Sequence, residues 1–180
     1  MRTIILAAFL AIAAALPAQA ADQYTDCSKE AGKDDGGDAP AVCGRLISSN
    51  RYKGLELARL YSNRALAYTK AEKLDLALAD ANRAIQISPT YVFAYDNRGE
   101  IKRMRKDYDG AIVDYNKAIQ LDPEFVAAYL DRGSAFKEMG NRKSARADFQ
   151  AVLDMKGKGR PIDEWAKKRA RELIDELGTD

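Results

Sequence analysis

The sequence predicts an all-α protein, a right-handed α-solenoid of helix-turn-helix repeats. One 34-residue pattern occurs three times in succession between Ala58 and Met155. Each copy divides into two stretches with apolar or small residues at i, i+3, i+4 and i+7, joined by a short polar turn. Proline closes the first two copies, at Pro89 and Pro123. A fixed period of this length is typical of stacked repeats, which present extended surfaces rather than enclosed catalytic cavities.

The first element is a signal peptide over residues 1–20. Arg2 gives it a positive start, residues 4–16 form an uncharged apolar run, and Ala18 and Ala20 are small residues of the kind that a signal peptidase reads. The run would form a helix of about 20 Å, shorter than the ~30 Å hydrocarbon core of a bilayer, and a retained membrane anchor is the alternative. We expect an exported protein that begins at Ala21 and is periplasmic, or else secreted.

Residues 21–57 are predicted to form an N-terminal cap. Cys27 and Cys43 both precede the repeats, and in an oxidising compartment such a pair favours a disulfide over a metal or redox site. The closed loop of about fifteen residues corresponds to roughly 3 kcal/mol in the chain-entropy model. Residues 39–49 are predicted to form a helix that resembles the second helix of a repeat but lacks the first helix as its partner. The disulfide would tie the N-terminal tail to that helix.

The three copies cover residues 58–91, 92–125 and 126–155. Small residues let the two helices of a copy approach closely, and larger residues fill the space around that contact. The recurring positions are Tyr61, Tyr95 and Tyr129; Ala65, Gly99 and Gly133; Tyr68, Lys102 and Phe136; Ala77, Ala111 and Ala145; Ala81, Tyr115 and Phe149; and Ala84, Ala118 and Val152.

These residues resemble the tetratricopeptide repeat (TPR), which places an aromatic, a small residue, an aromatic, Ala, an aromatic, Ala and Pro at the same offsets. Copy two carries nearly all of them. The departures are Lys102 and Ala81, where an aromatic is usual, and Gly157, where Pro is usual. The resemblance covers 98 of the 160 residues after the predicted signal peptide. The chain also resembles short exported bacterial TPR proteins with a cysteine-containing front segment.

One departure from the family recurs in every copy. Arginine replaces the usual leucine after the first aromatic, and an aspartate follows sixteen residues later. Antiparallel helices would bring the two offsets together, so we expect a ladder of ion pairs, within or between repeats, with the arginine stems over apolar surface. The alternative is that the arginines bind an anionic ligand. The predicted pairs are Arg64 with Asp80, Arg98 with Asp114, and Arg132 with Asp148.

Residues 156–180 are predicted to be a basic linker followed by a C-terminal cap helix. Pro161 suits the first turn of a helix. The predicted inner face is one stripe with three apolar residues beside it, and the outer face is charged. The stripe is Ile162, Trp165, Arg169, Leu173 and Leu177, and the residues beside it are Ala166, Ala170 and Ile174. This interpretation makes Trp165 structural, whereas an exposed Trp165 would indicate a docking site.

Composition argues against catalysis and against nucleic acid. The chain has no histidine, and no nucleophile elbow or glycine-rich phosphate loop follows a predicted strand. Residues 21–180 contain 28 basic side chains (29 less Arg2) and 27 acidic ones, without the basic surplus that phosphate binding needs. We expect no enzyme activity, no cofactor, no metal and no nucleic-acid partner.

The resemblance implies a concave groove lined by the first helix of each repeat. The implied groove residues are Arg59, Ser62, Asn63, Leu66 and Lys70 in copy one; Phe93, Asp96, Asn97, Glu100 and Arg103 in copy two; and Ala127, Leu130, Asp131, Ser134 and Lys137 in copy three. The carboxamides of Asn63 and Asn97 would bond to a peptide backbone. The family's carboxylate-clamp subclass needs Lys and Arg where this chain has Phe93 and Asn97, which argues against capture of acidic chaperone tails.

The sequence therefore predicts a non-catalytic protein–protein interaction module, a TPR scaffold of the bacterial cell envelope that holds a peptide or partner protein in its groove. Two alternatives remain open. One is a carbohydrate or cell-wall binding module, for which Phe93 is the only exposed aromatic candidate in the groove. The other is a self-assembling structural element.

Overall fold

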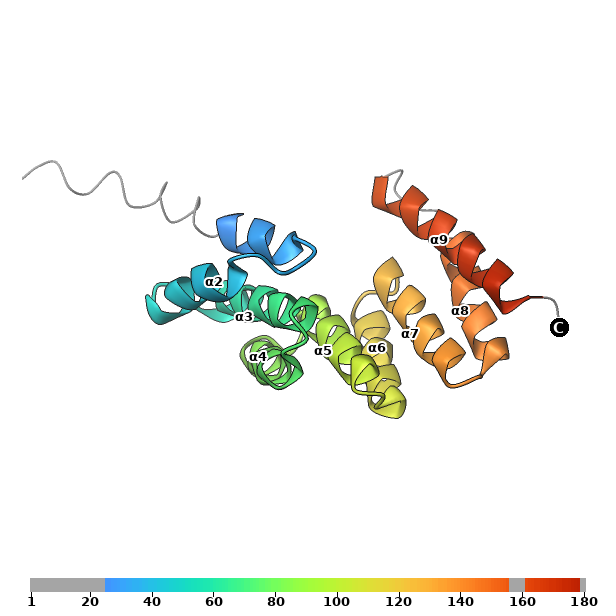
Figure 1. The fold of residues 1–180 in the computed structure, drawn as a ribbon, viewed down its shortest axis with the longest axis horizontal. Helices are drawn as coiled ribbons and strands as arrows, with labels where there is room; N and C mark the ends of the chain where they lie inside the picture. Colours follow the sequence, from blue (N-terminus) through green and yellow to red (C-terminus); the bar gives the residue numbers. More distant parts are fainter. Residues whose placement is uncertain (1–24, 156–160, 179–180) are drawn as a thin grey trace, which may run out of the picture.

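The computed structural model describes residues 25–155 and 161–178, and all regular structure within them is helical. The prediction of an all-α solenoid is confirmed (Figure 1). The predicted signal peptide, residues 1–20, and the predicted linker, residues 156–160, lie outside the described residues. After a helical segment at 25–32, the helices are α2 (Ala39–Ser48), α3 (Gly54–Lys70), α4 (Leu74–Ile87), α5 (Val92–Met104), α6 (Tyr108–Leu121), α7 (Val126–Glu138), α8 (Arg142–Asp154) and α9 (Pro161–Leu177).

The helices form two layers of unequal density. Each repeat is an antiparallel pair, α3 with α4, α5 with α6 and α7 with α8, and the pairs follow one another along the molecule (Figure 1). The first helices α3, α5, α7 and α9 contact one another in order, whereas α2, α4, α6 and α8 make no mutual contacts in the described parts of the chain. The first helices therefore form the tightly packed inner layer, and the second helices splay apart outside it.

Glycine sets the spacing of the helices in copies two and three. A Cβ atom on Gly99 would lie 2.6 Å from the Tyr115 ring, and one on Gly133 would lie 2.5 Å from the Phe149 ring. Both rings are fully buried. The absent side chain is what lets the ring of the second helix rest on the backbone of the first.

The turns inside the three repeats share one geometry. The second residue after the first helix adopts a left-handed conformation in each copy, at Glu72, Lys106 and Gly140. The following amide then donates back five residues, for example from Asp107 to the Lys102 carbonyl at 2.9 Å. This hydrogen bond is the long bond of a Schellman motif, which ends the helix and directs the chain into the next one.

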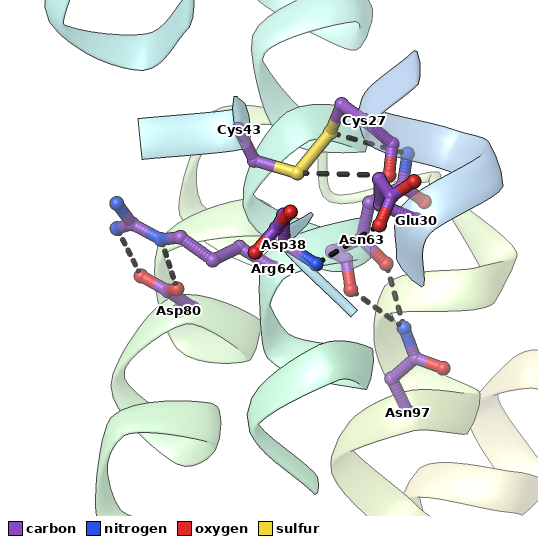
Figure 2. The surroundings of a disulfide bond; sticks show 9 residues. Cys27, Glu30, Asp38, Cys43, Asn63, Arg64, Asp80 and Asn97 are labelled. Atoms are coloured by element: carbon purple, nitrogen blue, oxygen red, sulfur yellow. Dashed lines mark hydrogen bonds and ion pairs between the residues drawn. A yellow bond between two sulfur atoms is a disulfide. The ribbon is translucent and has the colours of Figure 1, made fainter. Parts of the chain in front are cut away.

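The N-terminal cap is more ordered than the sequence predicted. The structure contains the Cys27–Cys43 disulfide with both residues fully buried, and it joins two helices because residues 25–32 are helical (Figure 2). The prediction that the α2 helix lacks a partner is therefore wrong. Since Cys27, Cys43, Leu46 and Leu60 share one apolar cluster, the cap is a shortened helical pair that packs on copy one.

The C-terminal cap helix α9 packs on copy three as predicted, and the prediction fails only at the Trp165 end of the stripe. Ala166, Ala170, Leu173 and Leu177 are buried against residues of α7 and α8, whereas Trp165 is 58% exposed. The prediction of a structural Trp165 is wrong. Four residues turn an α-helix by 400°, so each successive residue of the stripe that begins at Trp165 is rotated further around the helix. The stripe therefore faces solvent at Trp165 and reaches copy three at Leu173 and Leu177, on the face where Ala166 and Ala170 lie. None of the described helices has the length and apolar character needed to span a bilayer.

Candidate functional site

The three arginines form the ion-pair ladder that the sequence predicts, each within its own repeat. Arg64 donates to both carboxylate oxygens of Asp80 at 2.6 and 2.8 Å (Figure 2). The pairs of copies two and three are likewise bidentate, at 2.9 and 2.6 Å: Arg98 with Asp114, and Arg132 with Asp148. The aspartates are at most 6% exposed.

The ladder also links neighbouring repeats. The remaining amino group of Arg98 donates to Asn82 of copy one at 2.9 Å, and that of Arg132 donates to Asn116 of copy two. Each guanidinium lies over the tyrosine that opens its repeat, for example Arg98 at 5.7 Å from the Tyr95 ring centre. These arginines are occupied by internal contacts, which leaves the alternative of an anionic ligand without support.

Lys102, the departure of copy two from the family pattern, belongs to the same network. Its ammonium lies 2.7 Å from Asp114 and donates to the Gly110 carbonyl at 3.3 Å. Asp114 therefore holds two cations, which explains a lysine where an aromatic is usual.

Several predicted groove residues of copies one and two bond within the protein. Asn97 donates its amide hydrogens to the carbonyl and hydroxyl of Ser62 at 3.1 and 2.8 Å, and the amide of Asn63 lies 3.8 Å from the Cys27 sulfur (Figure 2). Lys70 donates to the carbonyls of Gly32 and Lys33 at the end of the helical segment 25–32. The side-chain nitrogen of Asn97 thus links α5 to α3, and those of Asn63 and Lys70 link α3 to the helical segment 25–32. Leu66 packs against the N-terminal apolar cluster. Arg59 remains exposed.

At the other end, α9 covers part of copy three. Leu130 is only 5% exposed and lies in the apolar cluster with α9, so its placement in the ligand groove is wrong. Ser134 donates to the Leu130 carbonyl at 2.8 Å, and Lys137 pairs with Glu176 of α9. The central part of the inner layer, along α5 and the facing part of α7, is the remaining candidate.

An acidic cluster lies on this central part. Arg103 forms a bidentate pair with Glu100 at 2.8 Å and also bonds to Glu138 of α7, and Tyr115 donates to Glu100 at 3.4 Å. Asp96 differs, because its Oδ1 atom is buried and has no hydrogen-bond partner among the described residues.

The repeat brings Asp131 close to Asp96. Asn97 contacts Ser62 in the preceding first helix, and one period later the same two offsets are occupied by Asp131 and Asp96. Burial raises the pKa of Asp96 well above its ordinary value, and the charges of Asp131 and Glu100 raise it further. Burial, with the charge of Glu100, raises the pKa of Asp131 to about 7. Both aspartates are predicted groove residues, but their pairing was not predicted, although the repeat offset indicates it.

An aromatic cluster begins one helical turn before Asp96. Phe93 is 51% exposed, and its ring centre lies 5.6 Å from that of Tyr91 and 5.0 Å from that of Phe125. Because Phe125 immediately precedes α7, the cluster bridges the starts of the two helices. The uncovered inner face thus carries an aromatic end followed by carboxylates.

Other surfaces of the described residues are weaker candidates for a binding site than the inner face. Within the described ranges, no group of three or more acidic or cysteine side chains is arranged to hold a metal ion. A shallow depression of about 480 Å³ lies along α5 and α6, lined by residues that include Arg98 and Asp114. Those two charges already satisfy each other.

Comparison with known protein families agrees with this geometry. Patterns described as tetratricopeptide repeat match residues 58–91 and 126–158, and one described as TPR repeat matches residues 99–140. This chain belongs to the tetratricopeptide repeat family. The helical pairs and the packed inner layer are thus those of a TPR array.

Relatives match parts of this TPR protein. The Hsp70-Hsp90 organizing protein of wheat (Triticum aestivum) is 38% identical over 50 residues, which span 28% of this chain and 9% of that relative. Among solved structures, the Arabidopsis OM64 TPR domain is 27% identical with a TM-score of 0.55, and the match covers 67% of this chain and 98% of that one. The second TPR domain of human RPAP3, solved in complex with the HSP70 peptide SGPTIEEVD, is 23% identical with a TM-score of 0.59, covering 71% and 100%.

Proposed function

We propose that this TPR protein is a non-catalytic protein–protein interaction module of the bacterial cell envelope, and that it binds a peptide or partner protein along α5 and α7. The observation that carries the proposal is the inner face between the two caps, which the described residues leave open. Phe93 is exposed there, and an oxygen of Asp96 has no partner among those residues. TPR domains of similar fold have been solved with peptides bound. The short inner layer fits a modest, transient interface.

The envelope location rests on two features. The sequence of residues 1–20 has the character of a signal peptide, and a buried disulfide such as Cys27–Cys43 persists in an oxidising compartment. A protein in the envelope would not meet the acidic tails of cytosolic chaperones. Phe93 and Asn97 also argue against such a ligand, because the carboxylate clamp needs cations at these positions.

A photocrosslinking amino acid placed at single exposed positions tests the proposal. We would place it at Phe93 on the inner face and, as the matched control, at Val113 on α6, which is 65% exposed. An adduct with one partner protein from Phe93 and none from Val113 is the expected result. An adduct from Val113 alone would contradict the inner face as the binding surface, and adducts only with further copies of this chain would favour self-assembly.

A carbohydrate or cell-wall ligand is the second candidate. The exposed Phe93 ring with Tyr91 and Phe125 beside it is the observation that favours it, although the rings meet at 38° and 71° and form no common flat face. Sedimentation with purified peptidoglycan tests this candidate: binding that is lost in Phe93→Ala would support it, and no sedimentation would exclude it.

A further inference from the structure

We propose that Asp96 and Asp131 form a subsite for an alkylammonium group, the side chain of a lysine in an extended peptide bound along α5 and α7. This inference rests on the proposed function and specifies the chemistry of the partner.

The first step is the buried oxygen of Asp96. A buried carboxylate oxygen without a hydrogen-bond donor is uncommon in folded proteins, because the group loses its hydration and gains nothing in return. The side-chain donors of α5 are directed elsewhere: Asn97 to Ser62, and Arg103 to Glu100 and Glu138. Arg98 and Lys102 bind Asp114. With no donor among the described residues, this oxygen can be satisfied by a proton that the carboxylate pair retains or by the donor of a bound ligand.

The second step is the sign of the charge. The cluster holds four acidic side chains and one arginine, for a net charge of −3 when all are ionised (4 acids less 1 base): Asp96, Glu100, Asp131 and Glu138 with Arg103. Since Glu100 and Glu138 share the arginine, the uncompensated charge falls on Asp96 and Asp131. The potential there favours a cation and repels an acidic peptide.

The third step is the kind of cation. An ammonium carries three donors on a compact head, which suits two carboxylates on neighbouring helices, and its methylene stem packs on apolar surface. Phe93 offers such surface one helical turn from Asp96, where the stem would lie along the ring.

The protonation state supports the same geometry. With the pKa of Asp131 raised to about 7 and that of Asp96 raised well above its ordinary value, the pair retains a proton near neutral pH when no cation is present. An incoming ammonium takes the place of that proton. Affinity for a lysine ligand is therefore expected to rise as the pH increases through 7. The other titratable groups that act on the pair are Glu100 and Arg103 of α5. Glu138 of α7 acts on Arg103, and the charges of the pair act on Tyr115 of α6.

The test titrates the oxidised protein with N-acetyl-lysine-N-methylamide and follows backbone amide shifts by NMR at pH 6 and pH 8. The neutral isostere N-acetyl-norleucine-N-methylamide is the control ligand, and N-acetyl-arginine-N-methylamide distinguishes a guanidinium from an ammonium. The expected result is saturable amide shifts confined to α5 and α7. The affinity that they report should be higher at pH 8 than at pH 6, and at least tenfold lower in the double variant Asp96→Asn/Asp131→Asn. The exposed Asp109→Asn is the matched control and leaves the shifts unchanged.

Equal shifts with lysine and norleucine ligands, or shifts retained in the double Asn variant, would overturn the subsite. A stronger response to the arginine ligand would overturn its assignment to an alkylammonium. Panning a displayed peptide library on the same two proteins separates this inference from the proposed function. Some selected peptides could lack basic residues, bind wild type and double variant equally, and fail to bind Phe93→Ala. That result would support the groove and contradict the lysine subsite. A library that yields no peptide would count against the proposed function, while the titration would still decide the subsite.

Discussion

Gly99 lies against the ring of Tyr115 so closely that a methyl group on Gly99 would stand 2.6 Å from the ring. Copy three repeats the arrangement with Gly133 and Phe149. Copy one has alanine at both offsets, Ala65 and Ala81, which share one apolar cluster. The small and large residues of a repeat therefore compensate each other across the helical pair.

Gly99→Ala is expected to destabilise the protein by about 1–3 kcal/mol, because the buried Tyr115 ring has no space into which to move. Urea unfolding followed by circular dichroism measures the change. Gly44→Ala is the control, since its Cβ would meet only Arg64, at an ordinary 3.5 Å, and helix propensity alone predicts a gain of up to about 1 kcal/mol. If both variants were stabilised, the close contact would be wrong.

Arg132→Ala is expected to destabilise the fold by roughly 2–3 kcal/mol, because it leaves the buried carboxylate of Asp148 without its bidentate partner. Arg98→Ala is expected to cost about 1 kcal/mol less, since Lys102 still pairs with Asp114. Chemical denaturation of both variants gives the comparison. Adding Lys102→Ala to Arg98→Ala should remove the difference, and equal effects of the two single substitutions would contradict a role for Lys102.

Replacing both Cys27 and Cys43 by serine is expected to lower the free energy of unfolding by about 3 kcal/mol, the loop-closure value for a loop of this size. Hydrogen exchange should show the loss concentrated in residues 25–48, with the amides of α7 little affected. Reducing agent should destabilise the wild type and leave the variant unchanged. A uniform rise in exchange along the chain would argue against a local role for the disulfide.

Asp131→Asn is expected to stabilise the protein in a pH-dependent way. An unfolded Asp titrates near ~3.9, whereas the pKa of folded Asp131 is about 7, so the folded state holds the extra proton between these values and stability falls as the pH rises through that window. The variant should therefore match wild type near pH 4 and gain on the order of 1–3 kcal/mol at pH 8, after discounting for solvent screening. Thermal unfolding at pH 4 and pH 8, with Asp109→Asn as the control variant, measures this difference. An equal change in stability at the two pH values would contradict the raised pKa of Asp131.

The two sides of α9 are expected to respond differently to truncation. Leu173→Ala removes a buried side chain from the cluster with copy three and should cost about 2–5 kcal/mol, whereas the exposed Trp165→Ala should cost less than ~0.5 kcal/mol. Thermal unfolding ranks the two. Iodide should quench Trp165 fluorescence efficiently in the folded protein; a shielded indole would instead restore the inward orientation that the sequence suggested.

The repeat pattern predicted the architecture because its periodicity is a property of the chain itself. The Tyr61, Tyr95 and Tyr129 series fixes where each helical pair starts, and the sixteen-residue offset brings Arg98 to Asp114 in any antiparallel pair of this length. Information of this kind needs no knowledge of neighbouring elements.

The caps and the site depended on contacts that the period does not encode. Helix formation at residues 25–32 comes from packing on copy one, which outweighs a local sequence that ends in a glycine-rich turn. The burial of Leu130 and the exposure of Trp165 follow from where α9 lands on copy three. The pairing of Asp96 with Asp131 required a comparison of positions between repeats, and each carboxylate alone is unremarkable in a chain with 31% charged residues.

The disulfide fastens only one end of the array. In a linear stack each unit is held by its immediate neighbours, and of the described helices α9 at the far end contacts only α7 and α8. Loss of structure should thus have a direction, starting at α9 and moving toward the locked N-terminal pair. The face along α5 would then outlast the first openings, so the array keeps its recognition surface while its C-terminal end comes apart.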